Sequence, residues 1–299
     1  MIYPFSSPPV ELEDYFLINH KLYNAHMDKH RNARSFNEQL PDLHNFVLGL
    51  VAARNAGRIN SWEDLDEQVL AFFTPERMER MEVLVPHWQK MASYREGVTL
   101  THVICVFLGL YMLPEYQMLT AHQQNLMQWI VLLHDVEKQA EKGRRDPFHA
   151  FRSAVPAARA LHRLGFETNS EYALLIDRWS ELVLSACVQP EGAPEPIQDN
   201  RRYPEILEGI DHMFGKGSDA AAIVKTVLFH MSVNAVKEWP QAAALTIDEI
   251  TRYIDRDVLP LLKAMMLSDN EGWSMFYADR ETQRSDTLDV YEELEKLIH

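Results

Sequence analysis

The stretch "WIVLLHDVEKQ", residues 129–139, places an apolar helical run directly before His134 and Asp135, and charged residues follow. An ionised carboxylate next to a buried helical turn is costly unless it is hydrogen-bonded, paired or bound to a metal ion. The stretch therefore predicts a helix in the core of the fold. It also predicts that this helix holds two adjacent side chains of the kinds that bind metals.

The same helical spacing extends through the chain. Apolar residues recur three and four positions apart, and Asn-Gly or Asp-Gly hairpin turns are absent from the sequence, as is typical of an all-α fold. A capping box is expected at Ser61 with Asp64, and an N-cap at Asp146 before Pro147. We expect helices over residues 15–30, 40–56, 61–72, 75–92, 98–112, 118–141, 147–163, 170–187, 203–214, 218–236, 246–266 and 286–298.

Two stretches depart from this pattern. Residues 1–14 are rich in Pro and Ser and predict an extended leader, without the basic and apolar regions of a signal peptide. Residues 189–202 contain three prolines and predict a loop within one domain. We expect residues 1–94 to form a helical extension that packs on a metal-binding helical region, residues 95–299, as one compact unit.

Composition narrows the classes of function. The net charge is −15, from 44 acidic and 29 basic residues, whereas a nucleic-acid polymer requires a basic surface. The longest uncharged apolar run, residues 103–113, is about half of a membrane span. Cys105 and Cys187 are the two cysteines, so a disulfide framework is not expected. We expect a cytoplasmic protein that binds a small molecule, and the sequence leaves its oligomeric state open.

Two further histidines are candidates for binding a metal ion or a phosphate. His102 begins the apolar run "THVICVFLGL", and His149 lies in "FHAFRSA" at an expected helix start, followed by Arg152. A helix N-terminus with a histidine and an arginine suits a phosphate as well as a metal ion. Taken singly, each of these residues is explained as well by a core histidine or a capped surface helix.

Together these motifs resemble the HD superfamily of metal-dependent phosphohydrolases. The resemblance is carried by His102, by "LLHDVEK" with Lys138 after His134–Asp135, and by "FHAFRSA". The following helix, which ends in "RLGF", is similar to the HD domains of CCA-adding enzymes. The resemblance covers roughly residues 95–270 and implies an all-α fold that gathers His, His-Asp and a distant Asp around divalent ions.

The resemblance also implies two later ligands. It places a histidine at His230 in "VLFHMSV", with Cys187 as the rival position, and a closing aspartate at Asp269 in "LLKAMMLSDNEGW", with Asp211 and Asp257 as rivals. Nitrogen and oxygen donors without a thiolate suit one or two ions of Fe, Mn, Ni, Co or Zn. The expected ligands are His102, His134, Asp135, His149, His230 and Asp269.

The function implied is hydrolysis of a phosphomonoester or phosphodiester in a small metabolite or nucleotide, through a metal-activated water. Asp135 and Lys138 would have catalytic roles, and Lys138, Arg145 and Arg152 would bind the phosphate. Two other functions remain open. One is a di-iron oxygenase resembling myo-inositol oxygenase, which uses the same numbers of His and Asp ligands. The other is a non-catalytic binding module with a structural metal.

Overall fold

The computed structural model describes residues 35–94, 98–139, 146, 148–188, 197–233, 244–277 and 280–298. The chain divides into two units at residue 33, and all described residues belong to the second, residues 33–299. The expected leader at 1–14 and the expected helix at 15–30 lie outside the described residues.

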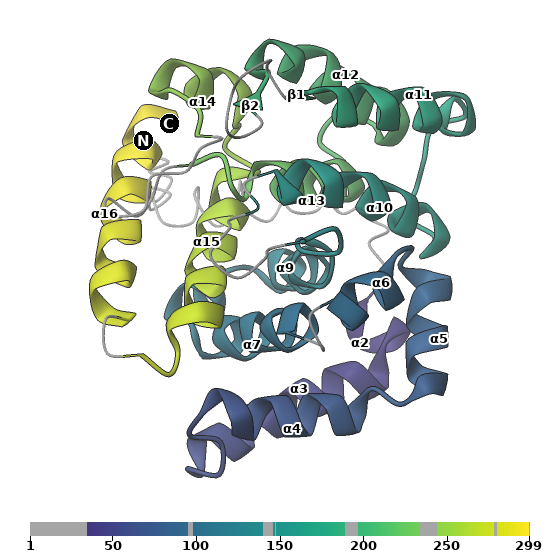
Figure 1. The fold of residues 1–299 in the computed structure, drawn as a ribbon. Coiled ribbons are helices and arrows are strands. Elements are labelled where there is room, and N and C mark those ends of the chain that lie inside the picture. The colour runs from purple at the N-terminus through teal and green to yellow at the C-terminus, as the bar shows by residue number, and fades with distance from the viewer. Residues whose placement is uncertain are drawn as a thin grey trace, which may run out of the picture. The chain divides into compact units, whose positions relative to one another are not determined.

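Helices make up about three quarters of the described chain and the two strands have two residues each, which confirms the all-α prediction (Figure 1). In chain order the elements are α2 (Phe36–Gln39), α3 (Pro41–Asn55), α4 (Trp62–Phe72), α5 (Pro75–Leu84), α6 (Trp88–Ser93), α7 (Val98–Met112), α8 (Pro114–Met118), α9 (Ala121–Leu133), α10 (His149–Arg163), α11 (Tyr172–Ser185), β1 (Cys187–Val188), β2 (Ile197–Gln198), the 3-10 helix η3 (Asn200–Arg202), α12 (Tyr203–Phe214), α13 (Asp219–Phe229), α14 (Ile247–Tyr253), α15 (Leu259–Ser274) and α16 (Arg280–Ile298).

Helix α9 is the centre of the fold. Figure 1 views it nearly along its axis, with α7, α15, α13 and α10 packed around it. Thr120 and Gln123 form a capping box at its start. Its last turn, residues 129–133, is fully buried, because a helix that is apolar all round has to be covered on every side. The expected core position of this run is confirmed.

Helices α7 and α15 cross closely because each contributes a glycine to the contact. A Cβ atom added to Gly109 would lie 2.6 Å from Glu271 Cβ. One added to Gly272 would lie 3.1 Å from His102 Cε1 and would overlap Val106. Backbones approach to this distance only where no side chain intervenes. This close contact between the two helices therefore fixes the distance between side chains on α15 and side chains on α7.

The helices before α7 pack onto it. Helices α3, α4 and α6 contact α7, and α5 contacts α6. The capping box expected at Ser61 and Asp64 is present at the start of α4. The assignment of residues 1–94 as an extension remains a prediction.

Two expected helices are broken in the structure. The helix expected over 75–92 is interrupted between α5 and α6, where Pro86 lacks an N–H donor and His87 has a φ of 71°. The helix expected over 246–266 ends at Tyr253, and α15 begins at Leu259 with a proline in its first turn. In addition, α16 begins at Arg280 rather than at 286.

Two other helices end earlier than expected. The helix expected over 118–141 ends at Leu133, and residues 134–137 form a turn. The helix expected over 218–236 ends at Phe229. The C-cap residues are His134 and His230, and each ring Nδ1 lies within 2.8 Å of a carbonyl oxygen in the last turn. Last-turn carbonyls have no partner within a helix, so a histidine side chain can end the helix by bonding to one.

Of the loop expected over 189–202, the structure describes residues 197–202, which contain β2 and η3. Strand β1 pairs antiparallel with β2, with Cys187 opposite Gln198, and η3 follows. The helix expected over 170–187 therefore ends at Ser185 rather than at Cys187.

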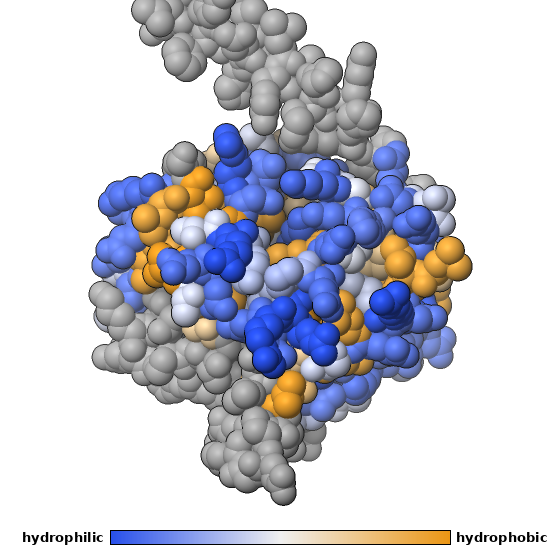
Figure 2. Space-filling model, turned by 90° about the horizontal axis from the view of Figure 1, so that it is seen from above, coloured by the Kyte–Doolittle hydropathy of each residue, from blue (hydrophilic) through white to orange (hydrophobic). Residues whose placement is uncertain are grey.

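The surface above α11, α12 and α14 is mainly hydrophilic. Figure 2 shows this face, where hydrophilic residues predominate among those described and apolar residues form separate patches. Exposed apolar side chains such as Leu174 and Leu184 on α11 are common on soluble domains and indicate nothing by themselves. Among the described helices, none has the length and apolar character needed to cross a membrane.

We expect Gly272→Ala to lower the free energy of unfolding by about 1–3 kcal/mol, because the added Cβ would overlap Val106 and force α15 away from α7. Gly49→Ala in α3 is the matched control. No atom lies within 4 Å of that added Cβ, and alanine in a helix interior is more stable than glycine by up to about 1 kcal/mol. Urea unfolding followed by circular dichroism measures both, and equal effects would contradict the close crossing.

Candidate metal centre

Six histidine and aspartate side chains meet at the C-terminal end of α9. His102 comes from α7, His149 begins α10, and Asp269 lies in α15. The other three are His134 and His230, the C-cap residues of α9 and α13, and Asp135, which follows His134. Each of the six residues exposes 7% or less of its surface. The structure thus brings together, from five parts of the chain, all six residues that the sequence analysis proposed as ligands.

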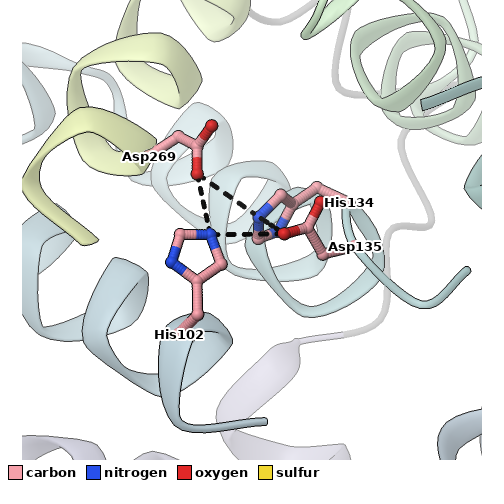
Figure 3. A group of neighbouring side chains, drawn as sticks. All are labelled: His102, His134, Asp135 and Asp269. Atoms are coloured by element: carbon pink, nitrogen blue, oxygen red, sulfur yellow. Dashed lines mark ion pairs between the residues drawn. The ribbon is translucent and has the colours of Figure 1, made fainter. Parts of the chain in front are cut away.

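The first donor group consists of His102, His134, Asp135 and Asp269 (Figure 3). The Nε2 atom of His102 lies 2.9 Å from Asp269 Oδ1 and 3.2 Å from Asp135 Oδ2. The Nε2 atom of His134 lies 3.3 Å from Asp135 Oδ2 and 3.8 Å from Asp269 Oδ1. Ligands bonded to one transition metal at about 2.0–2.2 Å lie at such separations from each other. The group has the spacing of a metal site.

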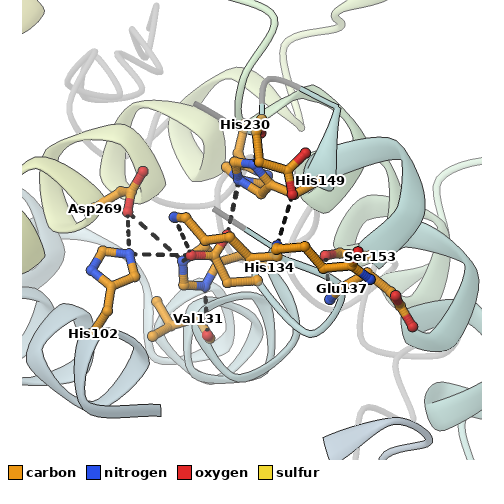
Figure 4. Close-up of polar contacts among 12 residues, drawn as sticks. His102, Val131, His134, Glu137, His149, Ser153, His230 and Asp269 are labelled. Carbon is orange, nitrogen blue, oxygen red and sulfur yellow. Dashed lines mark hydrogen bonds and ion pairs between the residues drawn. The ribbon is translucent and has the colours of Figure 1, made fainter. Parts of the chain in front are cut away.

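The second donor group consists of Asp135, His149 and His230 (Figure 4). The Oδ1 atom of Asp135 lies 2.9 Å from His149 Nε2 and 3.7 Å from His230 Nε2. The two Nε2 atoms are 3.0 Å apart. Asp135 therefore offers Oδ2 to the first group and Oδ1 to the second, which is the arrangement of a carboxylate that bridges two ions.

Three of the four histidines are oriented by the main chain. Each places its Nδ1 atom against the carbonyl oxygen of the residue three positions earlier, and the pairs are His134 with Val131, His149 with Asp146, and His230 with Val227. A carbonyl only accepts, so Nδ1 carries the proton and Nε2 keeps its lone pair. This is the usual support of a metal-binding histidine. In neutral rings of this tautomer the facing Nε2 atoms of His149 and His230 are both acceptors, and a cation bound between them would remove the repulsion.

Several buried donor atoms lack a hydrogen-bond partner in the part of the chain that the structure describes. They are both ring nitrogens of His102, Nε2 of His134, Oδ1 of Asp135 and Oδ1 of Asp269. A buried polar atom without a partner costs about 1–3 kcal/mol, and such atoms are rare. A cation in the first group would be a partner for Nε2 of His102, Nε2 of His134 and Oδ1 of Asp269, and a cation in the second group would be one for Oδ1 of Asp135. The donor set, imidazole nitrogen and carboxylate oxygen, fits a divalent transition metal.

The charges of the two aspartates also suit metal binding. Burial by itself would raise the pKa of Asp135, but His134, Lys138 and His149 outweigh it and hold that pKa well below its ordinary value. The pKa of Asp269 is likewise lowered, because His102 and Lys138 outweigh burial, which by itself would raise it. Burial lowers the pKa of His149. Ionised carboxylates and neutral imidazoles are the forms that ligate metals.

Lys138 belongs to the same centre. The residue is buried, and its ammonium forms an ion pair with Asp135 Oδ2. Burial would lower its pKa, but the carboxylates of Asp135 and Asp269 raise the pKa above its ordinary value. The ammonium therefore stays charged beside the ligands. The Lys138–Asp135 pair is thus buried and is not a solvated surface ion pair.

The structure describes one of the two arginines expected to bind phosphate. Arg152 forms an ion pair with Asp146, and its Nη2 lies 3.4 Å from the carbonyl oxygen of Glu137. Asp146 is not the N-cap that its sequence predicts. Phe148 occupies that position without a side-chain bond, because the Asp146 carboxylate instead accepts from Arg152 and from the backbone of Gln139. Arg145 lies outside the described residues.

The rival ligands lie elsewhere. Cys187 is a free thiol in β1, and burial raises its pKa to about 11. Asp211 forms an ion pair with Lys225 at 2.7 Å. Asp257 is exposed to solvent. The structure places His230 and Asp269, rather than these three, in the donor groups.

The sequence analysis did not predict the contacts that hold Glu137 in the turn after α9, here called the clamp on Glu137. Lys90 Nζ donates to Glu137 Oε2 at 2.8 Å, and His87 contacts the other carboxylate oxygen. The backbone N–H of Glu137 donates to Ser153 Oγ at 3.1 Å. The positive φ of His87 is uncommon outside glycine and costs of the order of 1–3 kcal/mol. The partners of Glu137 lie far away in sequence, so no local spacing reveals the clamp.

A cavity of about 220 Å³ borders this turn. The lining residues are Lys90, Met91, Tyr94, Val136, Glu137, Lys138 and Gln139. Two of them are lysines, and Tyr94 closes one side by donating from its hydroxyl to the carbonyl oxygen of Gln139 at 2.9 Å.

Comparisons with known proteins assign no family to the chain: no family model, no curated protein and no solved structure matches it. A buried His/Asp cluster in an all-helical fold is compatible with an HD-like domain.

We expect Asp269→Asn to weaken metal binding by about 10- to 100-fold, because the amide is a poorer ligand than the carboxylate in the first donor group. Asp257→Asn is the matched control, since Asp257 is exposed on the turn before the same helix. Titration of the metal-free protein with Mn²⁺ measures both. Affinities that match in the two variants would remove Asp269 from the ligand set.

Because Asp135 is shared, we expect Asp135→Asn to remove bound metal from both donor groups, whereas His149→Ala should remove it from the second group alone. Elemental analysis of the purified variants gives the metal-to-protein ratio, and circular dichroism checks that the helices are retained. An Asp135→Asn protein with the full wild-type ratio would contradict the bridging arrangement.

Proposed function

We propose that this protein is a metal-dependent phosphohydrolase of the HD type that acts on a small phosphorylated metabolite or nucleotide. The observation that carries the proposal is the shared carboxylate. Asp135 turns one oxygen toward each of two groups of buried donors, with His102 on one side and His149 on the other. Paired ions held by a bridging ligand are a recurrent solution for phosphoester hydrolysis.

The first and second donor groups would each hold one divalent ion. When bound, such ions lower the pKa of a coordinated water and polarise a phosphoryl oxygen. The protein itself contributes by holding the ligand atoms in fixed positions. The main-chain carbonyls behind His134, His149 and His230 fix the direction of each Nε2 atom, so the ligands need no rearrangement during the reaction.

The charge of the centre favours a phosphate. The carboxylates of Asp135 and Asp269 together with the Lys138 ammonium leave one net negative charge. One or two divalent ions reverse that sign and attract an anion. Lys138, which is already buried and charged, would then balance part of the charge that develops on the transferred phosphoryl group.

The burial of the centre favours a small substrate. The side chains of the two donor groups expose 10% or less of their surface, so the scissile group has to enter a confined space. The cavity beside Lys138 holds about 220 Å³, which is below the usual range for drug-sized ligands. The net charge of −15 further disfavours a nucleic-acid polymer.

The shared carboxylate also supports a second candidate, a di-iron oxygenase resembling myo-inositol oxygenase. The two donor groups supply four histidines and two aspartates, and iron accepts such ligands. This candidate differs from the first in its requirements. It needs iron and dioxygen, whereas a hydrolase works with water and accepts redox-inactive metals.

The test is metal analysis of the purified protein followed by a screen of phosphoester substrates with Mn²⁺. We expect hydrolysis that stops with a chelator and returns with the metal. Lys138→Met should lower kcat by about 10²-fold or more while metal is retained, because a cation beside the phosphoryl group is lost. Lys263→Met is the matched control, since Lys263 pairs with Glu295 at 2.8 Å away from the donor groups.

Oxygen uptake by the iron-loaded protein, without phosphoester hydrolysis under either metal, would decide for the oxygenase. Loss of the fold on chelation, with neither activity, would identify a structural metal site and contradict both enzymes.

A further inference from the structure

His102 is held differently from the other three histidines of the donor groups. The other three place Nδ1 against a main-chain carbonyl, whereas Nδ1 of His102 has no hydrogen-bond partner among the described residues, and its Nε2 faces the carboxylates of Asp135 and Asp269. A metal-binding histidine normally has its ring plane and tautomer fixed by a bond to the second nitrogen. Something other than a hydrogen bond has to orient this ring.

Trp273 lies over the His102 ring. The two ring centroids are 4.1 Å apart, and the planes are inclined by 23°. Trp273 follows Asp269 by four residues on α15, which places it one helical turn along the same face. The adjacent Gly272 leaves the room required, because a Cβ there would lie 3.1 Å from His102 Cε1 and 3.2 Å from Nδ1. The imidazole therefore lies flat between its own helix and α15.

The indole of Trp273 is itself held in place. The Trp62 ring is parallel to it within 3°, with centroids 6.3 Å apart, and Lys138 Nζ lies 5.1 Å from the Trp273 centroid. A cation at this distance from an aromatic face is attracted to it. Trp273 nevertheless exposes 44% of its surface. Trp273 is therefore not a core residue, and its ring faces two buried side chains of the centre, His102 and Lys138.

We propose that Trp273 is a positioning residue for the metal ligand His102. Its indole face, in place of a hydrogen bond, fixes the plane of the imidazole so that Nε2 points at Asp135 and Asp269. The first donor group then depends on Trp273, while the second donor group does not. The proposal rests on metal binding by the two groups and not on the identity of the reaction.

The experiment compares Trp273→Leu, which keeps an apolar side chain without an aromatic face, with Trp273→Phe, which keeps the face. Tyr277→Leu is the matched control, since Tyr277 is an aromatic residue that is 67% exposed four residues further along the chain, beyond the end of α15. Metal-free protein is titrated with Mn²⁺ by calorimetry. The His149→Ala protein, which lacks a ligand of the second group, identifies which binding event belongs to the first.

We expect Trp273→Leu to weaken the ion of the first group by about 10- to 100-fold and to leave the other ion within about twofold of wild type. Trp273→Phe should stay within about threefold of wild type for both ions, and Tyr277→Leu should match wild type. Wild-type affinities in Trp273→Leu would overturn the proposal. Equal weakening of both ions, not rescued by phenylalanine, would also overturn it, because that result describes a general structural role.

A second measurement needs no metal. In metal-free protein labelled with ¹³C at histidine Cε1, the ring current of Trp273 should shift the His102 resonance. We expect Trp273→Leu to move and broaden that resonance while those of His134, His149 and His230 stay in place. An unmoved His102 resonance would overturn the proposal. If the wild-type protein binds no metal, the proposed function fails, and this measurement still decides the role of Trp273.

Discussion

The buried carboxylate of Asp135 is the constraint on which the rest of the site depends. It is fully buried at the end of a helix whose last turn is apolar on every side, and its neighbours keep its pKa low, so it stays ionised there. An uncompensated buried charge would cost more than the roughly 5–15 kcal/mol by which domains are stable. The chain therefore has to bring positive or metal-binding groups to this point. Lys138 does so locally, and α7, α10, α13 and α15 each bring a ligand from a distant part of the chain.

The ends of α9 and α13 show how local structure sets the chemistry. Each helix stops at a histidine whose Nδ1 bonds to a carbonyl of the last turn, His134 to Val131 and His230 to Val227. That bond satisfies a carbonyl which otherwise has no partner. It also leaves the lone pair of Nε2 facing the centre. One hydrogen bond at each helix end thus terminates the helix and aims a ligand, so the direction of the ligand is as rigid as the helix.

The sequence predicts the elements of this fold better than its contacts. The run at 129–133 announces a core helix because apolar residues occupy every side of it, and His134–Asp135 stands out because a carboxylate there is costly. Periodicity alone does not single out His230 and Asp269, and only the resemblance to HD proteins placed them. The helix end at Leu133, the clamp on Glu137 and the stacking of Trp273 on His102 escaped prediction. Each depends on partners far apart in sequence or on a side-chain bond that apolar spacing does not record.

The two donor groups differ in a way that bears on how such a centre works. In the second group, His149 and His230 are both tied to the main chain, and their side chains expose 3% or less. The first group contains Asp269, whose side chain is 10% exposed, and His102, which is covered by a half-exposed indole. Structural metal sites are closed, whereas catalytic sites keep a position open to substrate. The first group is therefore the side on which the centre meets solvent, and the second is the side that anchors Asp135. Under the proposed function, the second group would hold the buried Asp135 carboxylate rigid, and a substrate would approach from the side of Asp269 and His102.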